Sequence, residues 1–156
     1  MKKFYYLLLL LPFSLLMSCN DDKDFSPVDM TLTLDGVTTS GDVFYTVAGE
    51  NVSIENLSVK AVGNKNTTIT NVTFSFNGIP LIGVPGDPFM GTFSTENLPA
   101  GTYAINVTGN LLQVDSPIKV FAVNYPITIV KDEEDLPSGA PEIGSHSQTI
   151  TITNNK

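Results

Sequence analysis

Alternation of apolar and polar residues with a period of two is the sequence feature that most constrains this fold. It is clearest over residues 71–77, where Val72, Phe74 and Phe76 alternate with polar side chains. Successive side chains of a β-strand point to opposite faces of its sheet, so this pattern predicts a half-buried strand. No segment shows a convincing helical period of 3.6 residues. The chain is therefore predicted to be built from strands.

Turn residues divide the alternating pattern into short segments. Asn77-Gly78 predicts a tight type I′ turn, because both residues tolerate positive φ, and Pro80 places the returning strand at a sheet edge. A phase slip between Ile54 and Leu57 predicts a bulge or bend. About seven short strands at such spacing favour an antiparallel β-sandwich over a barrel. The expected strands are residues 30–34, 43–48, 52–61, 71–77, 79–84, 89–95, 103–108 and 118–130.

The middle of the chain resembles bacterial immunoglobulin-like repeats. Residues 74–83, Pro88-Phe89 and residues 98–107 supply an apolar strand, a residue-Gly turn, a Pro-aromatic pair and a Gly-x-aromatic strand start. Gly101 and Tyr103 also look like a tyrosine corner, in which the Tyr hydroxyl bonds back to the preceding loop. The resemblance implies an all-β, immunoglobulin-like sandwich over residues 29–131. The chain has no Trp and one Cys, unlike antibody domains.

The first residues predict a cleaved lipoprotein signal peptide over residues 1–18. Lys2 and Lys3 precede an apolar run over residues 4–17, which is shorter than the roughly 20 residues of a membrane span. Leu16-Met17-Ser18-Cys19 resembles the lipobox of bacterial lipoproteins, which implies cleavage before Cys19 and acylation of its thiol. A single Cys cannot form an intramolecular disulfide. The alternative is an ordinary signal peptide followed by an incidental cysteine.

The residues after Cys19 resemble the export signal of Bacteroidetes lipoproteins, which implies display on the outer face of the outer membrane. That stretch consists of Asn20, Asp21, Asp22, Lys23 and Asp24, and residues 19–28 are expected to form a flexible acidic tether. The formal charge of −8 includes two leader lysines, so the mature chain is more acidic still. The remaining lysines are scattered and no Arg is present, which argues against nucleic acid as a partner.

The inventory of catalytic groups is poor, so no catalytic residue, metal ligand or cofactor is predicted. The single His, His146, lies in a polar segment and is expected to be solvated. The acidic run 132–135 lacks the alternating ligands and glycine of a calcium loop. Residues 132–156 are therefore expected to be an acidic linker and tail. Within the tail, residues 149–153 alternate like one more strand, which either closes a sandwich edge or pairs with another chain.

These features predict a non-catalytic cell-envelope lipoprotein whose immunoglobulin-like domain is an interaction or spacer module. Its expected partners are the outer membrane, reached through Cys19, and a surface protein or glycan. One alternative is a glycan-binding accessory protein of a polysaccharide-uptake system, and another is a strand-exchanging adhesin or pilus-like subunit. An enzyme with an unrecognised carboxylate pair is the least favoured. Most strand aromatics are expected in the core, and the candidates for sugar stacking are Phe44, Tyr45, Phe89, Phe93, Tyr103, Phe121 and Tyr125.

Overall fold

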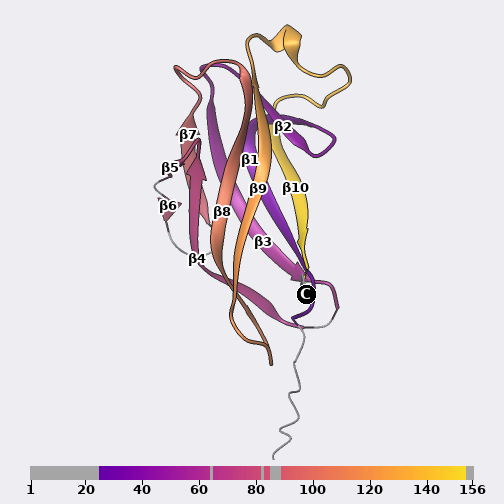
Figure 1. The fold of residues 1–156 in the computed structure, drawn as a ribbon. Coiled ribbons are helices and arrows are strands. Elements are labelled where there is room, and N and C mark those ends of the chain that lie inside the picture. Colours follow the sequence, from indigo (N-terminus) through magenta and orange to yellow (C-terminus); the bar gives the residue numbers. More distant parts are fainter. Residues whose placement is uncertain (1–24, 64, 82, 85–88, 154–156) are drawn as a thin grey trace, which may run out of the picture.

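The computed structural model describes residues 25–63, 65–81, 83–84 and 89–153, and most of these residues lie in strands. Figure 1 shows an elongated molecule whose long strands run between its two ends. One short 3-10 helix, η1 (Glu133–Asp135), follows the ninth strand. The strands are β1 (Val28–Ser40), β2 (Val43–Val47), β3 (Asn51–Ala61), β4 (Thr67–Phe76), β5 (Ile79–Pro80), β6 (Gly83–Val84), β7 (Met90–Ser94), β8 (Gly101–Gln113), β9 (Lys119–Val130) and β10 (Gly144–Ile152).

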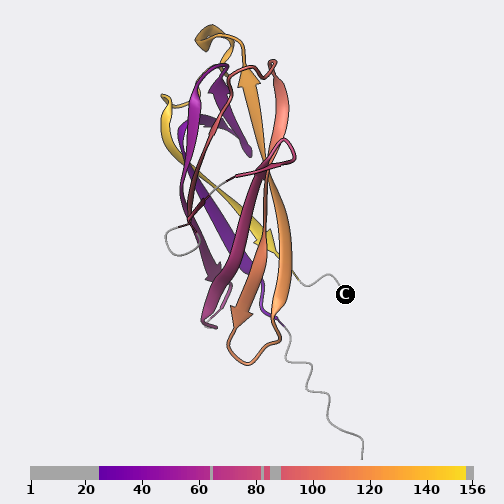
Figure 2. The same ribbon diagram turned by 90° about the vertical axis from the view of Figure 1, so that its left-hand side faces the viewer.

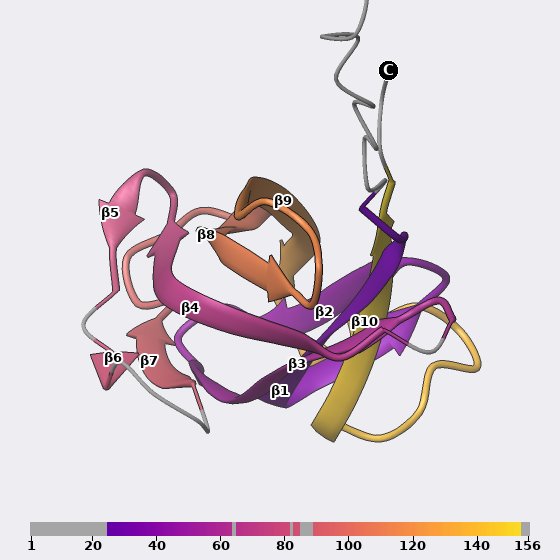
Figure 3. The same cartoon turned by 90° about the horizontal axis from the view of Figure 1, so that it is seen from below.

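The strand order divides the molecule into two layers that share β1. The first layer has the order β10-β1-β3-β7-β6, and the second has the order β5-β4-β8-β9-β2. β1 belongs to both layers because it bends at Gly36, where φ is 81°. Residues 28–35 pair with β3, whereas residues 38–40 pair with β2. Figure 3 views the layers from the end at which β1 begins.

This arrangement confirms the predicted all-β, immunoglobulin-like sandwich. Such a sandwich places strands A, B, E and D in one sheet and C, F and G in the other. β1, β3, β7 and β6 occupy the first set of places, and β4, β8 and β9 occupy the second. About seven strands was an underestimate, because β2 follows β1 as a separate strand that runs parallel to β9, and β10 adds to an edge. The expected return strand over residues 79–84 is also split, since β5 pairs with β4 while β6 pairs with β7.

Several local predictions are confirmed. The register between β1 and β3 shifts so that Thr33 faces Asn56 and Leu34 faces Ile54, which leaves Glu55 as the extra residue of a bulge. Asn77 and Gly78 both have positive φ, at 49° and 75°, as the type I′ turn requires. β5, which contains Pro80, ends the strand order of its layer.

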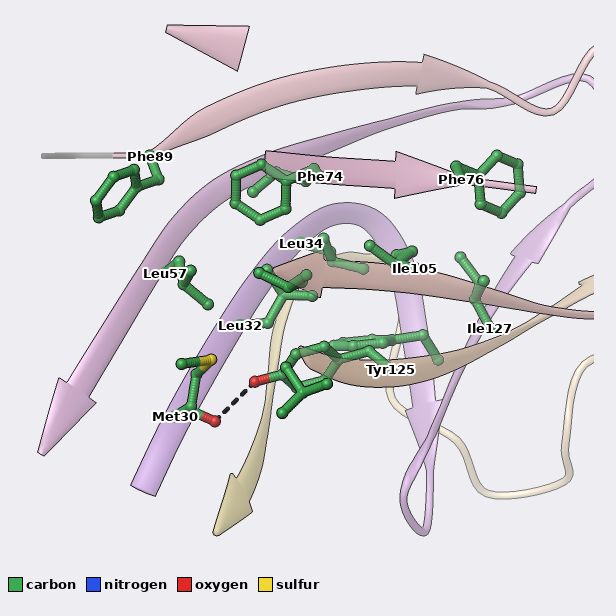
Figure 4. Close-up of a cluster of buried hydrophobic side chains, with 14 of the residues drawn as sticks. Met30, Leu32, Leu34, Leu57, Phe74, Phe76, Phe89, Ile105, Tyr125 and Ile127 are labelled. Atoms are coloured by element: carbon green, nitrogen blue, oxygen red, sulfur yellow. Dashed lines mark hydrogen bonds between the residues drawn. The ribbon is translucent and has the colours of Figure 1, made fainter. Parts of the chain in front are cut away.

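The core lies between the two layers and is held by contacts that cross it. Phe76 of β4 stacks on Phe93 of β7 with ring centroids 4.2 Å apart. Tyr125 of β9 is fully buried, and its hydroxyl donates a 2.8 Å hydrogen bond to the carbonyl oxygen of Met30 in β1 (Figure 4). Burial raises the pKa of Tyr125 far above its ordinary value, because the charged phenolate loses its solvation.

Replacing Tyr125 with Phe is expected to lower the free energy of unfolding by about 1 kcal/mol at neutral pH, because one buried hydrogen bond is lost. In the wild type the unfolded tyrosine ionises near pH 10 while the folded one stays neutral. Wild-type stability therefore falls above about pH 10, and Tyr125→Phe removes this loss. Urea unfolding of both proteins from pH 7 to pH 11 tests this expectation. A stability difference that stays constant up to pH 11 would contradict it.

The C-terminal segment forms β10, which closes the free edge of β1. Val28 faces Ile152, and the antiparallel pairing continues to Val37 opposite Gly144. Side chains reinforce the ladder, since the Thr151 hydroxyl donates a 2.6 Å hydrogen bond to the carboxylate of Asp29. The strand left unplaced by its sequence therefore belongs to the sandwich edge.

Candidate functional site

The chain enters the sandwich at the end that also carries the C-terminal strand's last residues, and we call this the entry end. Gln113, at the end of β8, holds the entering segment through its buried side-chain amide. The amide oxygen accepts a 2.7 Å hydrogen bond from the backbone N–H of Ser26. Its nitrogen donates to the Thr67 hydroxyl at 3.1 Å and to the Ser26 carbonyl oxygen at 3.3 Å. The first described residues are thus fixed to the body of the domain.

Lys119 joins the two ends of the described chain. Its ammonium lies 4.7 Å from the centre of the buried Phe25 ring, and it donates a 2.8 Å hydrogen bond to the carbonyl oxygen of Thr153. A cation over an aromatic face is attracted by the ring electrons. The start and the end of the described chain therefore lie together, which Figure 2 shows at the lower end of the molecule.

The predicted structural residues occupy the expected places. The Tyr103 hydroxyl donates a 2.8 Å hydrogen bond to the carbonyl oxygen of Pro99, which is the contact of a tyrosine corner. Gly101 begins β8 two residues before this tyrosine. Asn77 and Gly78 form the turn between β4 and β5. These residues shape the fold and do not converge on one site.

The remaining predicted residues fall into two groups. Cys19 and the acidic stretch Asn20, Asp21, Asp22, Lys23 and Asp24 lie outside the described residues. His146 lies in β10 and is half-buried, with its Nε2 atom 2.8 Å from the Glu142 carbonyl oxygen, so it is less solvated than the sequence predicted. Residues 132–135 are exposed around η1. Within the described ranges no three His, Cys, Asp or Glu side chains gather in a way that could hold a metal ion.

The aromatic side chains proposed for sugar stacking lie mostly in the core. Five of the seven candidates are buried, namely Phe44, Phe89, Phe93, Phe121 and Tyr125. Tyr45 and Tyr103 are half-buried, and the hydroxyl of Tyr103 is engaged in its corner. The part of the chain that the structure describes therefore presents no exposed aromatic platform for a sugar ring.

An open groove that the sequence did not predict lies between β3 and β4. It encloses about 700 Å³ and is lined by polar Asn56, Ser58 and Thr70 and by apolar Leu57, Ile69 and Phe89. β7 pairs only with residues 51–54 of β3, and β5 pairs only with residues 75–76 of β4. Residues 55–61 and 67–73 thus border the groove with edges that no described strand covers.

Free strand edges of this kind present backbone N–H and C=O groups in a regular row. An extended peptide can pair with such an edge and place alternate side chains into the adjoining groove. No sequence pattern predicts this groove, because its opening depends on where β7 and β5 end. Among the described residues that line the groove, none carries an acidic or basic side chain.

Comparison with family models, curated proteins and solved structures found no significant match to this chain. No helix among the described residues is long and apolar enough to cross a membrane.

Proposed function

We propose that the chain is a non-catalytic surface lipoprotein of the bacterial outer membrane, anchored through an acylated Cys19, with an immunoglobulin-like domain that binds a polypeptide partner. The Leu16-Met17-Ser18-Cys19 tetrapeptide and the acidic residues after it support the anchor. The open groove between β3 and β4 carries the binding part of the proposal. A Bacteroidetes-type lipoprotein with this domain is the identity that best fits both.

The groove favours an extended polypeptide over a glycan. Its two borders are strand edges that no described strand covers, and such edges can pair with the backbone of a guest peptide. Its floor contains Leu57, Ile69 and Phe89, which can contact alternate apolar side chains of that peptide. A glycan site would need exposed rings, and the aromatic candidates are buried or half-buried. A pure spacer needs no open edge, because uncovered strands invite unwanted pairing.

Hydrogen exchange of the mature protein, alone and mixed with detergent-solubilised envelope proteins of its host, tests this proposal. Amides of residues 55–61 and 67–73 are expected to become protected in the mixture, because a guest strand pairs with them. Amides of β8 serve as internal controls, because this strand pairs with β9 on one side and with β4 on the other along much of its length. Unchanged exchange at both borders of the groove would leave only the spacer function.

A matched pair of lysine variants sharpens the experiment. Thr70→Lys puts a charge into the groove and is expected to abolish the added protection, since charged edge residues block strand addition. Thr108→Lys carries the same change on an exposed position of β8 outside the groove and is expected to retain it. Equal loss in both variants would contradict a site in the groove.

A further inference from the structure

Exposed apolar side chains gather at the tip of the hairpin between β8 and β9. Leu112 and Val114 are 41% and 57% exposed, and Ile118 and Val120 are 64% and 76% exposed. Leu112 and Val120 lie in the strands beside Leu111, Gln113 and Phe121, which are buried, whereas Val114 and Ile118 lie in the turn that joins β8 to β9. We call these four residues the hairpin tip.

The concentration of these side chains is unusual for a surface. Eight large apolar residues in the described chain are exposed, and four of them belong to the hairpin tip. A fifth, Val62, lies at the same end, in the segment that leads from β3 towards β4. Isolated exposed apolar residues need no explanation, but a contiguous group marks a surface that is covered in the working protein.

The position of the hairpin tip indicates what covers it. The tip projects from the entry end, where β1 begins, as Figures 1 and 2 show. Cys19 precedes Phe25, the first described residue, by only six positions. Even a fully extended chain spans about 3.5 Å per residue, so an acyl anchor at Cys19 keeps Phe25 within about 20 Å of the membrane. The apolar end of the domain is therefore the end held closest to the lipid.

The charge distribution agrees with this orientation. Lys60, near the end of β3, and Lys119, at the start of β9, lie at the entry end, together with Asp29, which faces Lys60, and Asp115 in the turn between β8 and β9. The acidic residues 132–135 lie beyond the opposite end of β9. Anionic headgroups attract lysines and repel carboxylates over about a Debye length. The entry end is thus less acidic than the opposite end and repels an anionic lipid surface less.

We infer that the hairpin tip docks on the lipid surface and inserts its apolar side chains among the headgroups. This inference rests on the proposed anchor at Cys19. The anchor keeps the domain at the membrane, and the hairpin tip then fixes its tilt and presents the groove at a defined height. Partly exposed apolar residues suit the interface, because apolar groups there gain burial while the neighbouring polar backbone stays hydrated.

Single-tryptophan variants test the contact directly, because the chain has no Trp and only one Cys. Mature protein starting at Cys19 is coupled through this thiol to a maleimide lipid in anionic vesicles, which supplies the anchor whether or not the host acylates it. Val120→Trp is expected to show blue-shifted emission and to lose about half of its fluorescence to brominated acyl chains. Ile79→Trp, at a similarly exposed apolar site on β5, is expected to show neither change.

A second variant separates a true docking surface from the affinity of the probe itself. Leu112→Trp reports from the same face of the hairpin, and adding Ile118→Ser and Val120→Ser is expected to remove most of its quenching. Absence of quenching at Val120→Trp in vesicles that carry the coupled protein overturns the inference. Equal quenching at Val120→Trp and Ile79→Trp also overturns it. A finding that the native protein lacks acyl groups would contradict the proposed anchor, but the vesicle result would stand independently.

Discussion

Replacing Gly36 with Ala is expected to lower the free energy of unfolding by about 3 kcal/mol. Gly36 has a φ of 81°, and a left-handed conformation costs a residue with a side chain about 1 to 2 kcal/mol. A Cβ atom at this position would also lie 2.5 Å from the backbone oxygen of Asn51, where β3 begins. The clash forces the bend of β1 away from β3. This bend lets β1 pair with β3 in one layer and with β2 in the other, so strain at the bend destabilises both layers.

Gly41→Ala provides the matched control, since Gly41 has a φ of 58° and a Cβ there would meet nothing within 4 Å. This variant is expected to lower the free energy of unfolding by about 1 kcal/mol, because only the backbone conformation is strained. Urea unfolding of the two variants beside the wild type isolates the contribution of the contact with Asn51. An equal decrease in the free energy of unfolding of both variants would show that β1 and β3 can move apart at Gly36 without destabilising the fold. The Thr46 hydroxyl donates a 2.9 Å hydrogen bond to the Gly36 carbonyl oxygen, so its removal by Thr46→Val gives an independent measure of the same bend.

The turns and bends of this fold could be predicted because their causes are local. Positive φ at Asn77 and Gly78 follows from residues that tolerate it. The bulge at Glu55 follows from the change of phase within β3. Ile54 and Leu57 are both buried, although they are three positions apart and strict alternation would place them on opposite faces. The tyrosine corner joins Tyr103 to Pro99, only four residues upstream. Each signal lies within one short segment of sequence.

Pairing between distant strands could not be predicted in the same way. β10 bonds to β1 across 122 residues of sequence between Asp29 and Thr151, and its alternation fits a partner in the same chain or in another chain equally well. The groove depends on where β5 and β7 stop pairing, and such lengths follow from tertiary packing. The hairpin tip could not be predicted either, because Leu112 and Ile118 resemble core residues in the sequence and only the structure shows that they are exposed.

Replacing Cys19 with Ser in the full chain is expected to release the protein from the membrane fraction of its host almost completely. Each buried CH₂ of an acyl chain contributes about 0.8 kcal/mol, so two or three chains hold a protein at the membrane effectively without exchange. The hydroxyl of serine is not a substrate for thioether formation, and the hairpin tip alone gives only weak, reversible binding. Fractionation followed by immunoblotting measures the shift, and mass spectrometry of the wild-type N-terminus measures the acyl groups that cause it.

Ser18→Ala is the control for this experiment, because a small residue before the cysteine preserves the resemblance to a lipobox while changing the adjacent position. This variant is expected to stay in the membrane fraction. The isolated mature Cys19→Ser protein is expected to unfold at the wild-type urea concentration, since position 19 precedes the first described residue of the sandwich. Retention of Cys19→Ser in the membrane, or a wild-type terminus without acyl groups, would contradict the anchor. A released protein of unchanged stability would instead show that the cysteine acts on location alone, which separates the anchor from the fold that it carries.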